Sequence, residues 1–497
     1  MRPLYSIAEL RSIEHAAMES LPAGTLMQRA GAAAAQVALS LLRLPITAAE
    51  ILIIAGPGNN GGDALVVAAC LAKAGARITI KLCGDAATLP SDARQAWQQL
   101  ATIEVSVKFV EQVPIAHWSL VIDGLFGIGL TRPIEGALAE LLNTINRINC
   151  PRLALDVPSG LDADTGNIIG DHGCAFRATH TVTFIGDKPG LHTGVGRDYA
   201  GIVSVADLSI ESSLLGTTSL HLSSEATFAD ALQARQHFSH KGSYGDVIVL
   251  GGADGMSGAV LLAARAALFA GSGRVFAAFV GSAPTHDALH PELMCRSVDD
   301  IAFENATIVI GPGLGMSPKS HACLTRVLTQ SNSIVIDADA LNLIAAHTDL
   351  QALIQRQPAA TLMTPHPLEA ARLLGCSTAA VQADRLGAAT KLAQRFQATI
   401  ILKGSGTIIA RPDGQMMVNP NGNAALATAG TGDVLAGVCG ALLAQGRSLW
   451  HAAVGAVWLH GRAADALVEQ GCGPIGLTAG ELPVAIRHAL NTLVGTR

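Results

Sequence analysis

Short apolar runs alternate with helical patterns along both halves of the chain, and this alternation limits the fold more than any other feature. In the first half the apolar runs are Ile51–Ala55, Ile78–Leu82, Leu120–Asp123, Leu153–Asp156 and Thr181–Phe184. In the second half they are Val247–Leu250, Arg274–Phe279, Thr307–Ile310, Ile334–Asp337, Ala360–Met363 and Thr399–Leu402. Helical patterns lie between them, as at Asp63–Ala74 and Gly136–Asn146. Such alternation is typical of βαβ units and predicts α/β domains built on parallel sheets.

The chain has 497 residues, which is too long for a single core when a domain usually takes about 100–200 residues. The stretch Glu211–Ser224 is rich in Ser, Thr and Leu and has neither a strand nor a helix period. We therefore predict two domains, residues 1–212 and 226–497, joined by a linker at 213–225.

Composition narrows the class of protein further. Hydrophobic residues make up 49% of the chain and charged residues 14%, which suits well-buried α/β cores. The net charge is −6 and no Lys/Arg run occurs, so a nucleic-acid partner is not expected. The nine cysteines form no CxxC pair, and the apolar stretch Ala30–Leu42 is too short to span a membrane. We expect a cytoplasmic protein with no membrane partner that binds small molecules and forms a homo-oligomer.

A glycine-rich turn follows the first apolar run. Gly56-Pro-Gly-Asn-Asn-Gly-Gly-Asp63 leads from a predicted strand into a predicted helix, where backbone amides and the helix dipole favour an anion. A tight turn without a ligand is the alternative. Because the turn lacks the Lys and Ser/Thr of a P-loop and the spacing of a dinucleotide fingerprint, a generic dehydrogenase fits poorly.

Oxygen-bearing side chains gather at three strand ends of the first half. They are Asn60, Asp123, and Asp156 with Ser159. Ligands of open α/β sheets bind off the carboxyl ends of the strands, and an oxygen cluster suits a hard cation beside an anionic ligand. A single aspartate at such a position is often only a helix cap, but three agreeing strand ends favour a site.

These segments resemble the N-terminal domain of the NAD(P)HX epimerases over roughly residues 5–210. The matching motifs are Gly56-Pro-Gly-Asn-Asn-Gly-Gly-Asp63, Asp123-Gly-Leu-Phe-Gly-Ile-Gly129, Asp156-Val-Pro-Ser-Gly160 and Thr183-Phe-Ile-Gly-Asp-Lys-Pro-Gly190. The resemblance implies a Rossmann-like three-layer domain that interconverts the C6 epimers of hydrated NADH or NADPH. It implies a potassium ion held by Asn60, Asp123 and Ser159. It also implies substrate contacts from Asn59, Asn60, Gly61, Gly62, Asp63, Gly127, Ile128, Gly129, Leu130, Thr131, Arg132, Pro133 and Asp156.

Epimerisation requires proton transfer, and Asp156 is the best candidate for the acid/base residue. Lys188 is a weaker candidate, since a lysine in such a loop is more often exposed to solvent. Ala64 departs from the glycine usual in the family motif, a small change for which no effect is expected.

The second half carries an anion hole with a neighbouring carboxylate. Gly430 and Gly432 of Ala429-Gly-Thr-Gly-Asp433 allow consecutive amides to face one anion at the start of the helix Val434–Leu443. Asp433 is placed to accept a proton from an attacking hydroxyl. Lys403 follows an apolar strand, within reach of phosphates, and this combination makes a simple helix cap the weaker interpretation.

These residues resemble the ADP/ATP-dependent NAD(P)HX dehydratases, a branch of the ribokinase-like fold, over roughly residues 226–495. The motifs are Lys241-Gly-Ser-Tyr-Gly245, Gly311-Pro-Gly-Leu-Gly315, Asp337-Ala-Asp-Ala-Leu-Asn342, Thr364-Pro-His-Pro-Leu-Glu369, Lys403-Gly-Ser-Gly-Thr407 and Gly430-Thr-Gly-Asp433. The resemblance implies a three-layer domain that phosphorylates the C6 hydroxyl of hydrated NAD(P)H and then eliminates phosphate. It implies nucleotide binding by Lys403, Gly404, Ser405, Gly406, Thr407 and Gly432, and substrate contacts from Ala259, Gly313, Gly315, His366 and catalytic Asp433.

The leading hypothesis is thus a bifunctional repair enzyme that epimerises hydrated NAD(P)H and dehydrates the S form. ADP is the expected co-substrate, although the residues do not separate ADP from ATP, and Mg²⁺ is expected to shield the nucleotide. The alternative is a ribokinase-like vitamin or sugar kinase with a regulatory N-terminal nucleotide-binding module, which shares Asp433 and the anion hole. A third hypothesis, an RNA- or protein-binding scaffold, is disfavoured by the acidic balance and the set Asn60, Asp123 and Asp156.

Overall fold

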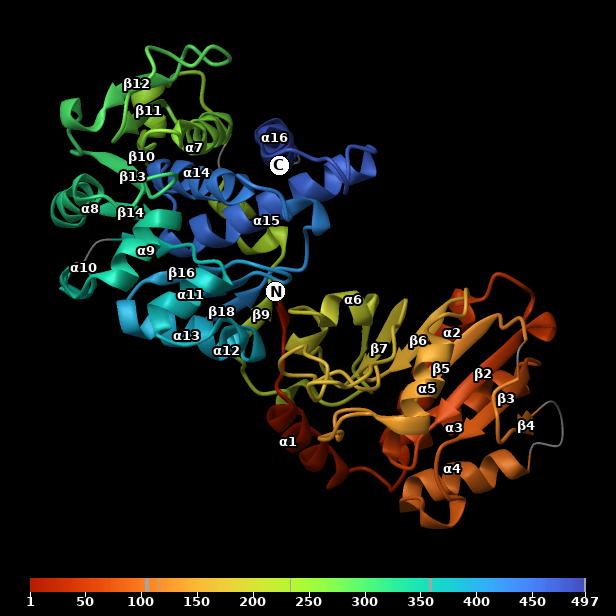
Figure 1. Cartoon of the computed structure of the whole chain (residues 1–497). Coiled ribbons are helices and arrows are strands. Elements are labelled where there is room, and N and C mark those ends of the chain that lie inside the picture. Colours follow the sequence, from red (N-terminus) through yellow and green to blue (C-terminus); the bar gives the residue numbers. More distant parts are fainter. Residues whose placement is uncertain (103–106, 115, 233, 357–359, 496–497) are drawn as a thin grey trace. The chain divides into compact units, whose positions relative to one another are not determined.

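The computed structural model describes residues 1–102, 107–114, 116–232, 234–356 and 360–495 (Figure 1). Apart from Met1, the chain divides into an N-terminal unit, Arg2–Thr218, and a C-terminal unit, Ser219–Arg497. Each unit is built on a sheet of mainly parallel strands between helices, which confirms the predicted α/β class. The division falls within the predicted linker 213–225. Part of that segment, Leu220–Leu222, is strand β9 of the C-terminal sheet rather than a connecting coil.

The N-terminal sheet is parallel, with the strand order β4-β3-β2-β5-β6-β7-β8 of a doubly wound, Rossmann-like domain. Its strands are β2 (Glu50–Ala55), β3 (Arg77–Leu82), β4 (Val107–Phe109), β5 (Leu120–Gly124), β6 (Arg152–Leu155), β7 (His180–Phe184) and β8 (Ile202–Ala206). Its main helices are α1 (Ile7–Met18), α2 (Thr25–Leu41), α3 (Asn59–Lys73), α4 (Ser91–Ala101), α5 (Gly136–Ile145) and α6 (Gly196–Ala200).

Strand β2 shows why this sheet needs helices on both faces. Ile51 and Ile53 pack into one core with residues of α2, α3 and α4, whereas Leu52 and Ile54 pack into a second core with α5. All four side chains are completely buried. A continuous apolar run of this kind is stable only between two layers of helices. The apolar runs of the sequence therefore fix the three-layer arrangement.

The C-terminal sheet carries strands in the order β9-β18-β17-β16-β15-β14-β13-β10-β11-β12, parallel except where β17 pairs with β16 and β18. The strands are β9 (Leu220–Leu222), β10 (Asp246–Gly251), β11 (Arg274–Phe279), β12 (Met294–Ser297), β13 (Ala306–Ile310), β14 (Ser333–Ile336), β15 (Ala360–Met363), β16 (Thr399–Leu402), β17 (Ile408–Ala410) and β18 (Met416–Val418). The hairpin β17–β18 was not predicted, because its strands are only three residues long and carry no clear alternation.

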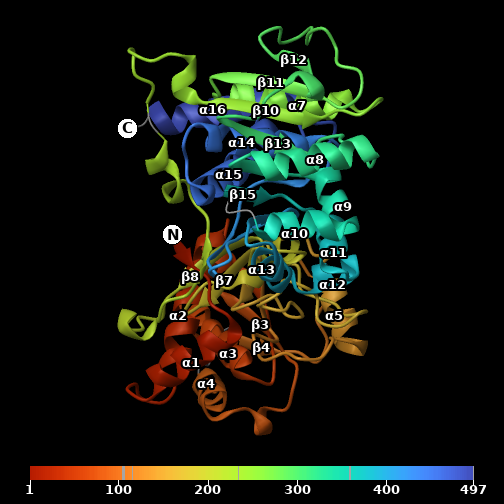
Figure 2. The same cartoon turned by 90° about the vertical axis from the view of Figure 1, so that its left-hand side faces the viewer.

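Helices cover both faces of this sheet as well (Figures 1 and 2). Alternate strand residues such as Val247 and Val309 form one core with α7 (Ser257–Phe269), α14 (Thr431–Ala444), α15 (Leu449–Glu469) and α16 (Leu482–Gly495). On the other face lie α8 (Pro318–Gln330), α9 (Ala338–Ala346), α10 (Thr348–Arg356), α11 (Pro367–Leu374) and α13 (Arg385–Phe396), with the short α12 (Thr378–Ala383) beside α11.

Every predicted strand is present, but three boundaries differ in ways that matter for the chemistry. Strand β6 ends at Leu155 and β14 at Ile336, so Asp156 and Asp337 lie just beyond the strands. Helix α3 begins at Asn59 rather than Asp63. Asn60 and Asp63 thus lie in the first turns of the helix and not in a loop before it.

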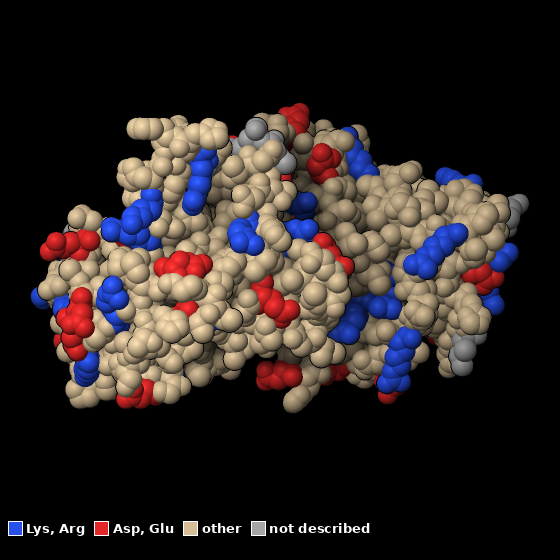
Figure 3. All heavy atoms as spheres, turned by 90° about the horizontal axis from the view of Figure 1, so that it is seen from above, with Lys and Arg blue, Asp and Glu red and all other residues tan. Residues whose placement is uncertain are grey.

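Charged side chains are sparse on the molecular surface. On the face drawn in Figure 3, Lys and Arg are interspersed with Asp and Glu and are separated by wide uncharged areas. In the described ranges no helix has the length and apolar character needed to cross a membrane.

Two helices of the C-terminal unit approach each other closely at a glycine. A Cβ atom built on Gly437 of α14 would lie 2.1 Å from the backbone oxygen of Ala263 in α7. Both helices contribute to the buried core of this unit. Helix backbones can come this near only where one of them carries no side chain.

We expect Gly437→Ala to lower the free energy of unfolding by about 1–3 kcal/mol, because the added methyl group forces the two helices apart. Urea denaturation followed by circular dichroism measures the change. Gly258→Ala in α7 is the matched control: nothing lies within 4 Å of its Cβ position, so it should not destabilise the protein. Equal effects of the two substitutions would contradict this account.

Candidate functional sites

A cavity of about 550 Å³ lies at the carboxyl ends of the N-terminal strands. Its polar wall includes residues from α1, the start of α3 and the segments after β5, β6 and β7: Arg11, Glu14, Asn59, Asn60, Asp63, Gly127, Gly129, Thr131, Arg132, Asp156 and Lys188. Ile128 and Leu130 also line it. Of the predicted strand-end residues, Asn60 and Asp156 line this cavity, and α1 adds two charged residues that carried no signal in the sequence.

Three of the predicted contact residues lie outside the lining of this cavity. A Cβ built on Gly61 would be 1.9 Å from the oxygen of Gly56, and one on Gly62 would be 2.5 Å from Cε of Met27. These two glycines therefore allow α3 to pack against its surroundings. Pro133 is not part of the lining and packs against Gly170. Substrate contact by these three residues stays a prediction.

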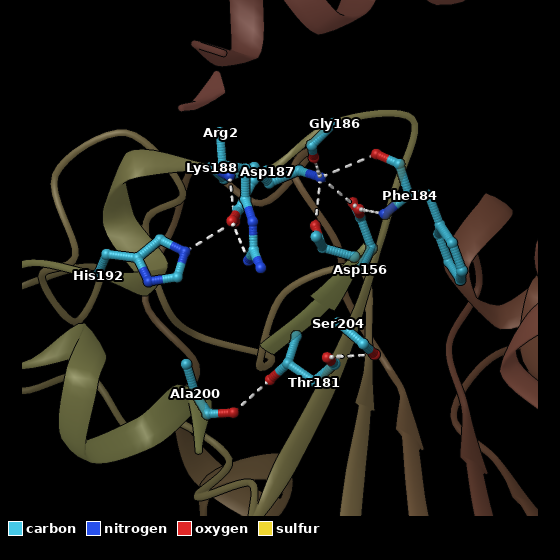
Figure 4. Close-up of polar contacts among 11 residues, drawn as sticks. Arg2, Asp156, Thr181, Phe184, Gly186, Asp187, Lys188, His192, Ala200 and Ser204 are labelled. Carbon is cyan, nitrogen blue, oxygen red and sulfur yellow. Dashed lines mark hydrogen bonds and ion pairs between the residues drawn. The ribbon is translucent and has the colours of Figure 1, made fainter. Parts of the chain in front are cut away.

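Asp156 forms a buried ion pair with Lys188 (Figure 4). The Lys188 ammonium lies 2.7 Å from Asp156 Oδ1 and donates to Thr183 Oγ1 at 2.6 Å, and its side chain is only 1% exposed. The interpretation of Lys188 as a solvent-exposed loop lysine is therefore wrong. Asp156 Oδ2 faces Gly127, whose Cβ position lies 3.3 Å away. One carboxylate oxygen is held by the lysine, and the other faces the segment that lines the cavity.

The backbone at these two strand ends is in an unusual conformation. Asp156 has φ 64° and Ile185 has φ 68°. Residues other than glycine rarely adopt positive φ, and a β-branched residue does so at a cost of about 1–3 kcal/mol. Such strain persists only where the surrounding structure enforces it, and it is common at functional sites. The strained backbone turns the Asp156 carboxylate out of the sheet and beside Lys188.

A second set of contacts fixes the loop that carries Lys188 (Figure 4). Asp187 is buried and accepts hydrogen bonds from Arg2 at 3.0 Å and from the Lys188 amide at 2.9 Å, and its other partner is His192 at 2.8 Å. Although burial by itself raises the pKa of Asp187, the contacts with His192 and Arg2 lower it below its usual value. Asp187 is thus held as a carboxylate that anchors the loop.

Asn60, Asp123 and Ser159 lie on three neighbouring segments behind this cavity. Ser159 donates to Asp123 through its hydroxyl at 2.7 Å and through its amide at 2.8 Å. Burial raises the pKa of Asp123 to about 6 despite these hydrogen bonds. Both amide atoms of the buried Asn60 side chain have no hydrogen-bond partner among the described residues. Unpartnered buried polar atoms beside a buried carboxylate fit a cation with oxygen ligands.

Further acidic residues surround Asp156. Burial, together with the charges of Asp156 and Glu14, raises the pKa of Asp63 well above its usual range. Glu14 on α1 has a raised pKa as well, first because it is buried and then because of Asp156. The cavity therefore gathers several acidic groups around the buried ammonium of Lys188.

The C-terminal unit has its own group of charged residues at the strand ends. Lys403, after β16, lies 2.8 Å from Asp337 Oδ1 after β14, and Thr364 donates to the same oxygen at 2.6 Å. Glu369 Oε2 lies 3.9 Å from the Lys403 ammonium. The predicted role of Lys403 as a phosphate-binding cation did not foresee these two carboxylate partners. The signal for Asp337 was nevertheless present, because it follows a strand directly, as Asp156 does.

Helix α14 begins beside this group. Gly430, with φ 88°, is its N-cap and provides no side chain to cap it, so the first amides of the helix are available to an anion. The Cβ position of Gly432 lies 3.2 Å from Lys403 Nζ. The lysine and the helix start thus face the same space.

Two carboxyl groups here titrate near neutral pH. Burial raises the pKa of Asp433 to about 7, with the charge of Asp337 adding to the effect. Burial also raises the pKa of Glu369 to about 7, although the Lys403 charge opposes the shift. Three carboxylates around one lysine leave an excess of negative charge. Oxygen ligands in that excess fit a hard divalent cation such as Mg²⁺.

The remaining predicted residues lie around this group. Gly404 and Gly406 have φ 130° and 62°, and the buried guanidinium of Arg385 donates to the oxygens of Lys403 and Gly406, which fixes the segment Lys403–Thr407. The His366 ring caps α11 by accepting from the amides of Leu368 and Glu369, so its Nδ1 is not open to a ligand.

A glycine-rich turn lies next to helix α7. The Cβ position of Gly313 is 3.3 Å from Ala259, and the Gly315 amide donates to Asp339 at 2.8 Å. Ala259, Gly313 and Gly315 thus lie on adjoining segments near the acidic residues that follow β14.

Two family models match the chain. The model described as NAD(P)H-hydrate dehydratase matches residues 247–483, and the model described as YjeF-related protein N-terminus matches residues 23–190. Each match falls within one of the two units.

Similar proteins align along nearly the whole chain. The bifunctional NAD(P)H-hydrate repair enzyme of Coxiella burnetii is 38% identical over 99% of this chain and 100% of its own length. The enzyme of the same name from Escherichia coli is 36% identical, with 94% and 89% covered. That of Leishmania braziliensis is 35% identical, with 99% and 94% covered.

Solved structures resemble the C-terminal unit. A ribokinase-like superfamily protein of Enterococcus faecalis V583 is 25% identical with a TM-score of 0.50, and the match covers 56% of this chain and 98% of that one. The ADP/ATP-dependent NAD(P)H-hydrate dehydratase of Bacillus subtilis, co-crystallised with ATP/Mg²⁺, is 30% identical with a TM-score of 0.48, covering 54% and 97%. The ribokinase-like fold predicted for this unit is confirmed.

Proposed function

Because the chain belongs to the family of bifunctional NAD(P)H-hydrate repair enzymes, with an epimerase and a dehydratase domain, we propose that its two charged strand-end sites carry out these two reactions. The epimerase site is the cavity around Asp156, and the dehydratase site is the group around Asp433. The vitamin or sugar kinase and the non-enzymatic scaffold are not favoured, since relatives of this name match the chain from end to end. The observation that carries the proposal is the buried Asp156–Lys188 pair facing a cavity of about 550 Å³.

In the epimerase site Asp156 and Lys188 would move the proton. Inverting C6 requires a bond to that carbon to break and form again, and its hydroxyl loses or gains a proton as this happens. Asp156 Oδ2 is the oxygen left free by Lys188, so it would exchange this proton. Lys188 would hold Oδ1 and fix the position of the carboxylate. Asn59, Asp63 and Gly127–Arg132 would bind the dinucleotide along the wall of the cavity.

Potassium is proposed for the set Asn60, Asp123 and Ser159. The support is the unpartnered amide of Asn60 and the buried carboxylate of Asp123. A monovalent cation held there would supply positive charge to the site. Asn60 connects this set of ligands to the cavity, because it is a proposed ligand and also lines the cavity.

In the dehydratase site Asp433 would accept the proton of the C6 hydroxyl as a phosphoryl group is transferred to that oxygen. Lys403 and the first amides of α14 would stabilise the charge on the transferring group. Phosphate then leaves with the C6 oxygen, expelled by the lone pair of the ring nitrogen, and loss of a proton from C5 to solvent restores the reduced cofactor. Asp337 and Glu369 would orient Lys403, and with their remaining oxygens they would hold Mg²⁺, which would neutralise charge on the nucleotide. We propose ADP as donor and the S epimer as substrate.

The cytoplasm is the proposed location. All nine cysteines are free in the structure, which is compatible with a reducing compartment. The homo-oligomer expected from the sequence stays a prediction.

The function is tested by incubating the protein with mixed epimers of hydrated NADH and with ADP or ATP in turn, while reduced nicotinamide absorbance and free phosphate are followed. We expect the protein to consume both epimers. Asp156→Asn should lower the epimerisation rate roughly 10²–10⁴-fold, so that only the accepted epimer is consumed quickly. Lys188→Met should act in the same direction. A phosphorylated product that accumulates without restored NADH would point to a kinase instead.

Each substitution has a control within the same chain. Asp156→Asn and Lys188→Met should leave the dehydration of the accepted epimer unchanged, because the dehydratase site belongs to the other unit. Asn also tolerates the positive φ of position 156 better than most residues, so the backbone of the turn should be kept. Normal epimerisation by both variants would rule out this pair as the acid/base group.

The potassium site is tested by thermal unfolding. KCl should raise the unfolding temperature of the protein more than choline chloride at the same ionic strength, because a cation that binds only the folded state stabilises it. Asn60→Ala should abolish the difference. Asn59→Ala, one residue away and exposed, is the matched control and should retain it. Identical unfolding temperatures of the wild-type protein in the two salts would exclude the site.

Dehydration should depend on pH through Asp433. Its pKa is raised to about 7, so the group is protonated below that pH and cannot accept a proton. We therefore expect kcat/KM for dehydration to fall as pH decreases through about 7. The charge of Glu369 contributes to the raised pKa, so Glu369→Gln should shift the midpoint of the profile to lower pH. A midpoint that stays in place, or moves upward, would contradict the assignment.

A further inference from the structure

The C-terminal unit has a cavity at the C-terminal end of helix α14, the end opposite to Asp433. It has a volume of about 440 Å³ and lies among α7, α16 and the turn after α14. Its apolar wall is formed by Leu232, Leu268, Phe269, Leu442, Leu490 and Val494. Three arginines, Arg235, Arg447 and Arg487, line the same cavity. The 14 residues of α14 separate it from the Asp433 end by about 21 Å at 1.5 Å per residue.

None of the guanidinium groups of these three arginines forms an ion pair among the residues that the structure describes. The one acidic residue in the lining, Glu292, lies 3.6 Å from His290. Nε of Arg447 is buried and has no hydrogen-bond partner in the described chain. Burial also lowers the pKa of Arg447.

Aromatic rings and backbone hold two of the arginines in place. The guanidinium carbon of Arg235 lies 3.9 Å from the centre of the Tyr244 ring, and this side chain also donates to the Gly271 oxygen. Arg487 lies over the Phe269 ring at 4.9 Å. Stacked guanidinium groups lose less conformational freedom when they bind an anion. The positive charges are therefore arranged before any ligand arrives.

We propose that this cavity is a second anion site, separate from both catalytic sites, which binds the phosphate group of a small molecule. Phosphate offers several charged oxygens that match the planar N–H pairs of more than one arginine. A volume of about 440 Å³ also admits an organic part against the leucine wall, within the usual range of small-molecule pockets. Its occupant is either inorganic phosphate or a phosphorylated metabolite, which share this chemistry.

Titration calorimetry on the full chain tests the site, with pyrophosphate as the probe. Lys403→Gln removes the cation of the dehydratase site and serves as the background, in which we expect binding to persist. Arg447→Gln in that background should weaken the remaining binding by roughly tenfold or more. Arg487→Gln, an exposed position where the fold is not at risk, should do the same. Arg77→Gln, an exposed arginine of the other unit, is the matched control.

The outcomes separate clearly. Loss of all pyrophosphate binding in Lys403→Gln alone would overturn the proposal, and so would unchanged affinity in both Arg447→Gln and Arg487→Gln. Titration with AMP and with inorganic phosphate then identifies the source of the phosphate group. Tighter binding of AMP assigns the site to a phosphorylated metabolite, and equal affinity assigns it to the free ion.

Discussion

A buried ion pair between a lysine and an aspartate lies at the carboxyl end of the sheet in each unit. Lys188 lies 2.7 Å from Asp156, and Lys403 lies 2.8 Å from Asp337. Removing one partner of such a pair leaves a buried charge alone, at a cost of about 3–5 kcal/mol. The surrounding groups therefore depend on both partners being present. The pairs keep four charged side chains in fixed positions at two places where several strands end together.

The two pairs are used differently. In the N-terminal unit the paired aspartate itself keeps one oxygen free, and it is the proposed proton acceptor. In the C-terminal unit Asp337 is occupied by Lys403 and Thr364, and the carboxylate left without such a partner is Asp433. The unequal surroundings explain why Asp433 has a pKa raised to about 7 by burial, whereas Asp337 is held by two donors. The same combination of residues thus forms the reactive group in one unit and its support in the other.

The sequence predicted the parallel strands and the residues that follow them, because apolar runs and strand-end aspartates are local signals. Asn60, Asp123 and Ser159 were identified in this way; Asn60 lines the N-terminal cavity, and Ser159 is hydrogen-bonded to Asp123. The prediction for Lys188 was wrong, because its burial depends on Thr183 and on the strained turn after β7. No local sequence pattern predicts that turn. Glu14 and Arg447 were not predicted as site residues for a related reason: each lines a cavity together with residues that are distant in sequence.

The left-handed backbone of Asp156 has a consequence for how this protein can change over generations. Only glycine and asparagine adopt that conformation readily besides aspartate. Asparagine would preserve the shape of the turn and remove the carboxylate. A lineage that no longer needed the first reaction would thus be able to lose it in one codon change while retaining the fold, although the buried Lys188 ammonium would lose its partner. Descendants with Asn at this position would be less stable but still folded, and they would perform only half of the repair.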